Sequence, residues 1–128
     1  MLNLSIGVVS QMGLTYIDGI VRGPSGKKTE LRFGLDSGAS YSLISRDQWK
    51  AIELSPKRSM KFTLADGTKI SRQVSECYIS LPQGEGHTPV ILGEDGDEPL
   101  LGVITLEILG SIFNPFNRTL QPMRALLA

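Results

Sequence analysis

The 128-residue sequence predicts a single, mostly β domain spanning residues 1–128. Short stretches in which apolar and polar residues alternate are separated by turns rich in glycine, proline and aspartate. Such alternation is typical of half-buried strands, because successive side chains point to opposite faces of a sheet. These stretches predict roughly six to eight strands and two short helices, in a chain long enough to bury a core.

The first predicted strands form a hairpin. An apolar run at residues 6–9 predicts an edge strand or a terminal arm. Residues 14–22 are rich in β-branched and aromatic side chains, which favour a strand. The turn signal at residues 23–28 joins this strand to a second one, which ends at Asp36.

A short helix and a long hairpin are predicted next. Ser45 and Gln48 have the spacing of a capping box, and Pro56 ends the helix that begins there. The hairpin has a polar tip at residues 65–68. The apolar residues of its return strand, which reaches Leu81, change parity, and this indicates a bulge or a bend.

The C-terminal part is predicted to consist of short elements, separated by glycine-containing or acidic loops. They are, in chain order, a loop at residues 83–87, a short buried strand at 89–92, an acidic loop at 94–98, a buried helix at 103–109 capped by Gly110, and a final hairpin around 114–118.

The composition excludes several classes of protein. Thirteen basic and thirteen acidic residues cancel, so bulk charge gives no reason to expect a nucleic-acid or membrane partner. No stretch approaches the roughly 20 apolar residues of a membrane span, and the N-terminus lacks the features of a signal peptide, so a cytoplasmic protein is expected. The single Cys77 cannot form an internal disulfide and is predicted to be a strand thiol rather than a nucleophile.

The stretch around Asp36 carries the strongest functional signal. Asp36-Ser37-Gly38-Ala39 resembles the D-[ST]-G-[AS] signature of aspartic proteases, and its surroundings are similar to the retroviral-like (retropepsin) branch. In that family the catalytic Asp ends a strand, a flap hairpin with a glycine-containing turn follows, and a hydrophobic-hydrophobic-Gly motif precedes a short helix. The same parts occur here in the same order: the Asp36 motif, then Ala65-Asp66-Gly67, then Leu100-Leu101-Gly102.

This resemblance implies a retropepsin-like closed β-barrel or sandwich half-domain with a flap hairpin. It also implies an aspartic-type endopeptidase without cofactor or metal. A chain with one such motif supplies one catalytic carboxylate, so the implied active form is a homodimer with an Asp36 from each chain. The resemblance also assigns the remaining roles. Ser37 braces the dimer, and Gly38 and Ala39 complete the active-site loop. Residues 65–67 form the tip of a flap that closes over a peptide substrate, and residues 100–102 support the site.

Two other classes of function stay open at this point. The same fold can be kept as a non-catalytic dimerisation or peptide-binding module. A serine hydrolase would have to use His87, the only histidine, but the sequence has no G-x-S-x-G elbow, and His87 is predicted to be an exposed loop residue. The acidic residues 94–98 lack the alternating spacing of a calcium loop, so no metal site is expected.

Overall fold

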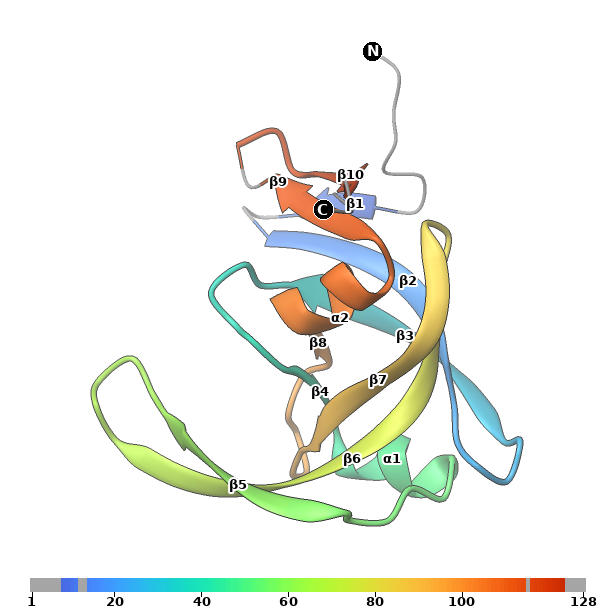
Figure 1. Cartoon of the computed structure of the whole chain (residues 1–128), viewed down its shortest axis with the longest axis vertical. Helices are drawn as coiled ribbons and strands as arrows, with labels where there is room; N and C mark the ends of the chain where they lie inside the picture. Colours follow the sequence, from blue (N-terminus) through green and yellow to red (C-terminus); the bar gives the residue numbers. More distant parts are fainter. Residues whose placement is uncertain (1–7, 12–13, 115, 124–128) are drawn as a thin grey trace, which may run out of the picture.

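The computed structural model describes residues 8–11, 14–114 and 116–123, and this part is mostly β, as predicted (Figure 1). Its strands are β1 (Val8–Gln11), β2 (Leu14–Arg22), β3 (Lys28–Leu35), β4 (Ser42–Ile44), β5 (Arg58–Thr63), β6 (Lys69–Leu81), β7 (Gly84–Leu92), β8 (Leu100–Leu101), β9 (Ser111–Asn114) and β10 (Thr119–Pro122). Its helices are α1 (Arg46–Ala51) and α2 (Val103–Ile108).

The main sheet closes on itself. Its eight strands run in the order β1-β2-β3-β8-β4-β7-β6-β5, and an additional pairing joins β2 to β6. This pairing makes a ring of β2, β3, β8, β4, β7 and β6, so the predicted closed barrel is confirmed. The β5–β6 hairpin continues beyond the ring and curves away from it (Figure 1).

Alternating side chains of the first hairpin fill the barrel. Ile17 and Val21 on β2 and Phe33 on β3 are fully buried. Between them, the exposed Asp18 and Arg32 form an ion pair, with Arg32 Nε 3.0 Å from Asp18 Oδ1. The alternation in the sequence therefore separates core from solvent, as a half-buried strand requires.

Both ends of the chain add antiparallel strands. β1 pairs with β2, so the predicted N-terminal edge strand is confirmed from Val8 onward. Residues 6 and 7 of that prediction lie outside the described residues. The predicted final hairpin is also confirmed, because β9 and β10 form a separate two-stranded sheet.

The first helix begins at the predicted capping box. The backbone N–H of Ser45 donates to Gln48 Oε1 at 2.8 Å, which satisfies a group that the helix itself leaves free. Ile52 follows α1 and is fully buried, and Trp49 packs against the core. Trp49 and Ile52 are therefore part of the core or packed against it.

The prediction of a buried helix at residues 103–109 is only half right. α2 ends at Ile108, and Gly110, with a φ of +78°, follows in the conformation of a C-terminal cap. One face of α2 is buried, but Val103 and Ile108 are 37% and 50% exposed. Neither described helix has the length and apolar character needed to cross a membrane.

The prediction of a loop at residues 83–87 is wrong. β6 and β7 form a hairpin in which Leu81 pairs with Gly84, so β7 begins where the loop was expected and includes the predicted strand at residues 89–92. A Cβ on Gly84 would lie 2.6 Å from the carbonyl oxygen of Leu109. Glycine is needed here for close packing of a strand and does not break it.

In the return strand of the hairpin, β6, the apolar residues change parity because the strand bends. The pairings of β6 with β5 and with β7 contain no inserted residue. The adjacent Val74 and Ser75 are nevertheless both buried. They lie where β6 passes from the hairpin with β5 into the barrel wall, and Figure 1 shows the strand curving there.

Cys77 is a buried thiol on β6, as the sequence predicts. Burial raises the pKa of this thiol from 9.0 to about 12, because the thiolate would lose its hydration. We expect a thiol reagent at about pH 8 to label the folded protein far more slowly than the protein in urea, since the thiolate is the reacting form. The contribution of the buried thiol to the free energy of unfolding is fully present below pH 9.0 and is lost as the pH rises toward about 12. Equal labelling rates with and without urea would contradict the burial.

Candidate active site

Asp36 lies at the end of β3 and begins a loop of small residues. Its backbone N–H donates to the carbonyl oxygen of Leu101 at 3.3 Å, which holds the strand end against β8. The N–H of Gly38 donates to Asp36 Oδ1 at 2.9 Å, and the N–H of Ala39 donates to the Asp36 carbonyl oxygen at 3.1 Å. The loop thus turns around its own carboxylate, which is exposed to solvent, as is Ser37.

Leu100, Leu101 and Gly102 hold this loop from its other side. β8 lies between β3 and β4, parallel to the first and antiparallel to the second. Directly after it, the N–H groups of the first two residues of α2 donate to the carbonyl oxygens of Ala39 (2.9 Å) and Ser40 (3.0 Å). The structure therefore brings together two motifs that are far apart in the sequence.

Gly102 allows this close approach. A Cβ at this position would lie 2.6 Å from both the carbonyl oxygen of Ser40 and the carbonyl carbon of Tyr41. The φ of Gly102 is −97°, which other residues adopt readily. Space against the neighbouring backbone, and not backbone conformation, is what requires glycine here.

A chain of buried hydroxyl groups lies beneath the loop. The N–H of Gly102 donates to Ser42 Oγ at 3.0 Å. Ser42 Oγ is 2.6 Å from Thr105 Oγ1, which in turn is 2.8 Å from Thr88 Oγ1. All three hydroxyl-bearing residues are at most 1% exposed, so their polar groups depend on one another.

Replacing Thr105 with Val is expected to cost about 1–3 kcal/mol of unfolding free energy, because two buried hydroxyl groups lose a partner. The free energy is measured by urea unfolding. Thr105→Ser is the matched control, since it keeps the hydroxyl, and it should lose less. A Val variant as stable as the wild type would show that the chain of hydroxyls contributes nothing.

The predicted tip, Ala65, Asp66 and Gly67, forms the turn between β5 and β6. Gly67 has a φ of +87°, which favours glycine. Asp66 Oδ1 accepts the N–H of Thr68 at 2.8 Å, and hydrogen bonding by the Thr68 side chain and backbone lowers the pKa of this exposed carboxyl. No heavy atom other than those of its chain neighbours lies within 4 Å of a Cβ built on Gly67. Figure 1 shows the tip of the β5–β6 hairpin apart from the loop that follows β3.

Tyr41 is a residue of this region that the sequence did not single out. Its ring meets that of Phe62 edge-on, with the centroids 5.6 Å apart, and its hydroxyl accepts a hydrogen bond from Arg58 Nη2 at 3.3 Å. Tyr41 directly follows the Asp36 loop, whereas Arg58 and Phe62 lie on β5. These contacts therefore connect the loop to the β5–β6 hairpin. No local sequence pattern predicts a contact between residues this far apart in the sequence.

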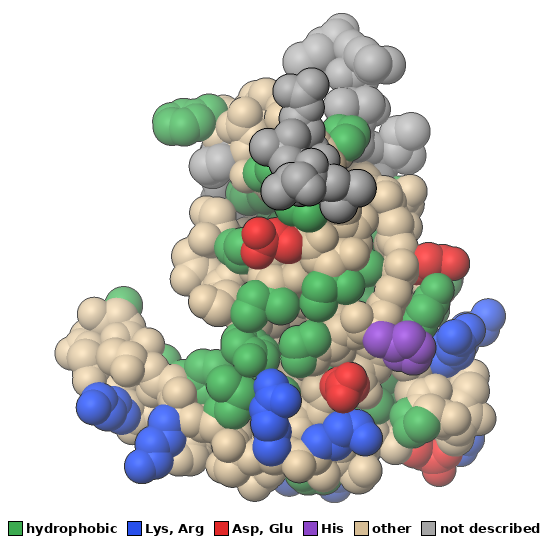
Figure 2. Space-filling model, in the orientation of Figure 1, with side chains coloured by type: hydrophobic (Ala, Val, Ile, Leu, Met, Phe, Trp, Pro, Cys, Tyr) green, Lys and Arg blue, Asp and Glu red, His purple; other side chains and the backbone are tan. Residues whose placement is uncertain are grey.

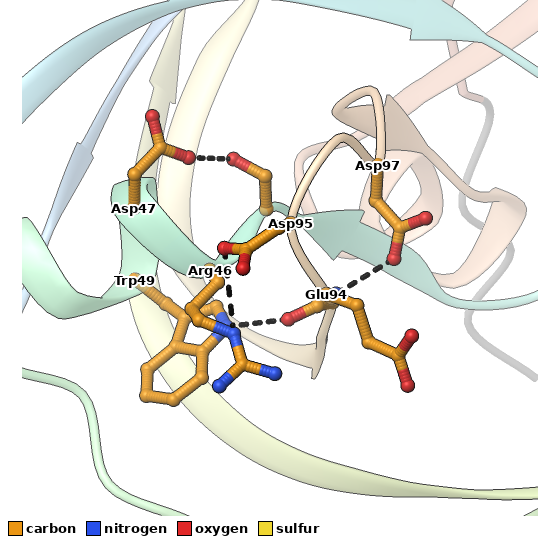
Figure 3. Close-up of polar contacts among 8 residues, drawn as sticks. Arg46, Asp47, Trp49, Glu94, Asp95 and Asp97 are labelled. Atoms are coloured by element: carbon orange, nitrogen blue, oxygen red, sulfur yellow. Dashed lines mark hydrogen bonds and ion pairs between the residues drawn. The ribbon is translucent and has the colours of Figure 1, made fainter.

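The acidic loop is held by protein groups (Figure 3). Arg46 Nε lies 3.5 Å from Asp95 Oδ1, and Trp49 Nε1 donates to a backbone carbonyl at the start of the loop at 2.8 Å. Asp97 Oδ2 accepts the backbone N–H of Glu94 at 2.7 Å. These contacts join the loop to α1 and set the path of the chain into β8.

The other candidates lie elsewhere in the fold. His87 is exposed, as predicted, but lies on β7 rather than in a loop, with its ring edge-on to Tyr78 at 5.0 Å. Within residues 8–11, 14–114 and 116–123, no group of three or more His, Cys, Asp or Glu side chains is placed to hold a metal ion.

Comparisons with known proteins identify the class of protein. The structure of EIAV protease complexed with the inhibitor HBY-793 has a similar fold, with a TM-score of 0.58 and 17% sequence identity, over 77% of this chain and 90% of that chain. The barrel is therefore a retropepsin-like fold. Residues 12–104 match the aspartyl protease family, and the chain belongs to that family. No curated protein matches the sequence significantly.

Proposed function

We propose that the chain is an aspartic endopeptidase whose active form is a homodimer. The observation that carries this proposal is the Asp36 loop, which presents one exposed carboxylate and is held in place by Leu101 and Gly102. Peptide hydrolysis by a carboxylate pair needs two such groups, and one chain supplies one. A second copy related by a two-fold axis supplies the other.

The pair of Asp36 carboxylates accounts for the chemistry. Two like charges so close cannot easily both be present, so the pair shares one proton. The ionised member accepts a proton from a water molecule, which attacks the scissile carbonyl carbon. The protonated member donates a hydrogen bond to the carbonyl oxygen, and a proton is then delivered to the leaving amine.

The β5–β6 hairpin would close over the substrate. Residues 65–67 form its tip, which lies apart from the Asp36 loop in the single chain (Figure 1). An extended peptide between the hairpin and the loop would bind through backbone hydrogen bonds and side-chain pockets, and closure would exclude water.

Exposed apolar side chains support the homodimer. Ile112 on β9 is 50% exposed and Phe116, in the turn after β9, is 98% exposed. Val103 and Ile108 of α2 are also exposed. A pocket of about 210 Å³ is lined by Ser37, Val103 and Ile112 among others. Exposed apolar surface of this kind, beside a candidate site, is typical of contact sites between proteins.

Replacing Ser37 with Ala is expected to weaken the dimer about 5- to 100-fold, if each chain loses one hydrogen bond across the axis. The fold should be unaffected, because Ser37 is exposed in the single chain. Sedimentation at several protein concentrations measures the association constant. Ser37→Thr keeps the hydroxyl and serves as the control. An unchanged association constant for the Ala variant would remove the bracing role.

Cleavage of a peptide library between about pH 4 and 7 tests the proposed function, because this range brackets a carboxylate pair that shares a proton. We expect cleavage that a pepstatin-like transition-state mimic blocks, and a specific activity that rises with protein concentration as dimers form. A preparation shown to be dimeric that cleaves nothing would contradict the endopeptidase. It would favour the non-catalytic peptide-binding module instead.

A further inference from the structure

The face of the β5–β6 hairpin that meets Tyr41 is defined by its register. Directly opposed residues of an antiparallel pair share a face, and Arg58 is opposite Val74, Met60 opposite Arg72, and Phe62 opposite Ile70. The contacts of Arg58 and Phe62 with Tyr41 identify this face as the inner one. Lys61, one residue from Phe62, points to the outer face and is exposed.

The inner face borders a hollow between the hairpin and the barrel. Figure 2 shows hydrophobic side chains gathered along this hollow, with basic side chains beside them. Tyr41 and Phe62 are both half-buried, so their rings keep surface that a bound peptide can cover. A substrate that reaches Asp36 from beneath the hairpin passes over these two rings.

Arg58 is the inner-face cation without a carboxylate partner in the described part of the chain. Arg72, on the same face, is 3.2 Å from Glu94 Oε1, and Arg32 and Arg46 also form ion pairs. The exposed Arg58 guanidinium donates only to the neutral hydroxyl of Tyr41 there. Its remaining N–H groups are arranged to bind a carboxylate in the two-pronged geometry that arginine favours.

The charge of the whole hairpin acts in the same direction. Residues 58–74 contain four basic side chains and one carboxylate, a formal net charge of +3, in a chain whose net charge is zero. The single carboxylate, Asp66, accepts a hydrogen bond from Thr68 at the tip. The hairpin therefore presents a positive field to whatever it covers.

We propose that Arg58 selects substrates in which an acidic side chain accompanies an apolar one. The acidic side chain pairs with the Arg58 guanidinium, and the apolar side chain covers the rings of Tyr41 and Phe62. This inference rests on the proposed endopeptidase, because it places the peptide between the hairpin and the Asp36 loop. It defines the substrate class as acidic, partly apolar extended peptides.

Binding to the inactive Asp36→Asn protein tests this selection. Fluorescent peptides are made in pairs that differ only by Glu or Gln at one position, with the position moved along the peptide, and affinities are read by anisotropy. At one position Glu should bind about fivefold more tightly than Gln, as expected for an arginine–carboxylate pair that is partly exposed. Added salt should reduce this ratio.

A second substitution identifies the residue responsible. Arg58→Gln should bring the Glu/Gln ratio to about one, whereas Lys61→Gln removes the same charge from the outer face of the same strand and should leave the ratio near its original value. A ratio that survives Arg58→Gln overturns the assignment. The assignment is also overturned if Lys61→Gln lowers the Glu/Gln ratio as much as Arg58→Gln does, because the preference would then reflect the general field of the hairpin. It is overturned as well if no peptide position prefers Glu.

The two proposals fail in different ways. If the wild-type protein cleaves the peptides without preferring Glu, the endopeptidase stands and the role of Arg58 is wrong. If the wild-type dimer cleaves none of them but binds Glu peptides in an Arg58-dependent way, the endopeptidase is wrong and the acidic-peptide site stands.

Discussion

The Asp36→Asn protein is expected to lose peptide hydrolysis by at least about 10²- to 10⁴-fold, the contribution of a general acid–base group. The amide has nearly the shape of the carboxylate but cannot take a proton from water. Two amides also cannot share a proton as two carboxyl groups can. The fold should persist, because the Asp36 side chain is exposed and, within the described residues, its Oδ1 accepts only the nearby N–H of Gly38. An amide oxygen can accept that bond as well.

The measurement compares initial cleavage rates of the two proteins at equal dimer concentration. Thermal unfolding and sedimentation should be alike for both, which separates lost chemistry from lost structure. Asp18→Asn is the matched control: Asp18 is exposed on β2, pairs with Arg32, and should be dispensable for cleavage. Wild-type activity in the Asp36 variant would exclude Asp36 as a catalytic residue.

Replacing Gly102 with Ala is expected to destabilise the fold by about 2–3 kcal/mol or more, at the upper end of the usual cost of overpacking. The added methyl would lie 2.6 Å from the backbone of Ser40 and Tyr41, and backbone cannot move aside as a flexible side chain can. Relief requires α2 to separate from the Asp36 loop. Activity should therefore fall together with stability.

Gly34→Ala is the control for this prediction. Gly34 lies on β3 close to the same site, but its added methyl would be 3.8 Å from the nearest heavy atom, an ordinary contact. Its unfolding free energy in urea should stay within about 1 kcal/mol of the wild type. Equal stability of the two Ala variants would show that the barrel relaxes around position 102 without cost.

Local pattern was sufficient for much of this fold. The alternation in β2 and β3, the capping box at Ser45 and Gln48, and the turn chemistry at Gly67 each depend on residues within a few positions of one another. The Asp36 motif and the Leu100-Leu101-Gly102 motif were likewise visible as separate signals. Their resemblance to a family predicted the retropepsin-like barrel, while the catalytic role of Asp36 is still a prediction.

Tertiary contacts decided the rest. Glycine at position 84 favours a loop by local pattern, yet Gly84 pairs with Leu81 in β7. The backbone of Leu109 lies too close for any larger residue there. The insertion of β8 between β3 and β4, the hydroxyl chain through Thr105, and the contact of Arg58 with Tyr41 all join residues distant in sequence. Side-chain periodicity reports which residues of a strand are buried, but not which distant residue they meet, so these contacts follow only from the closed barrel.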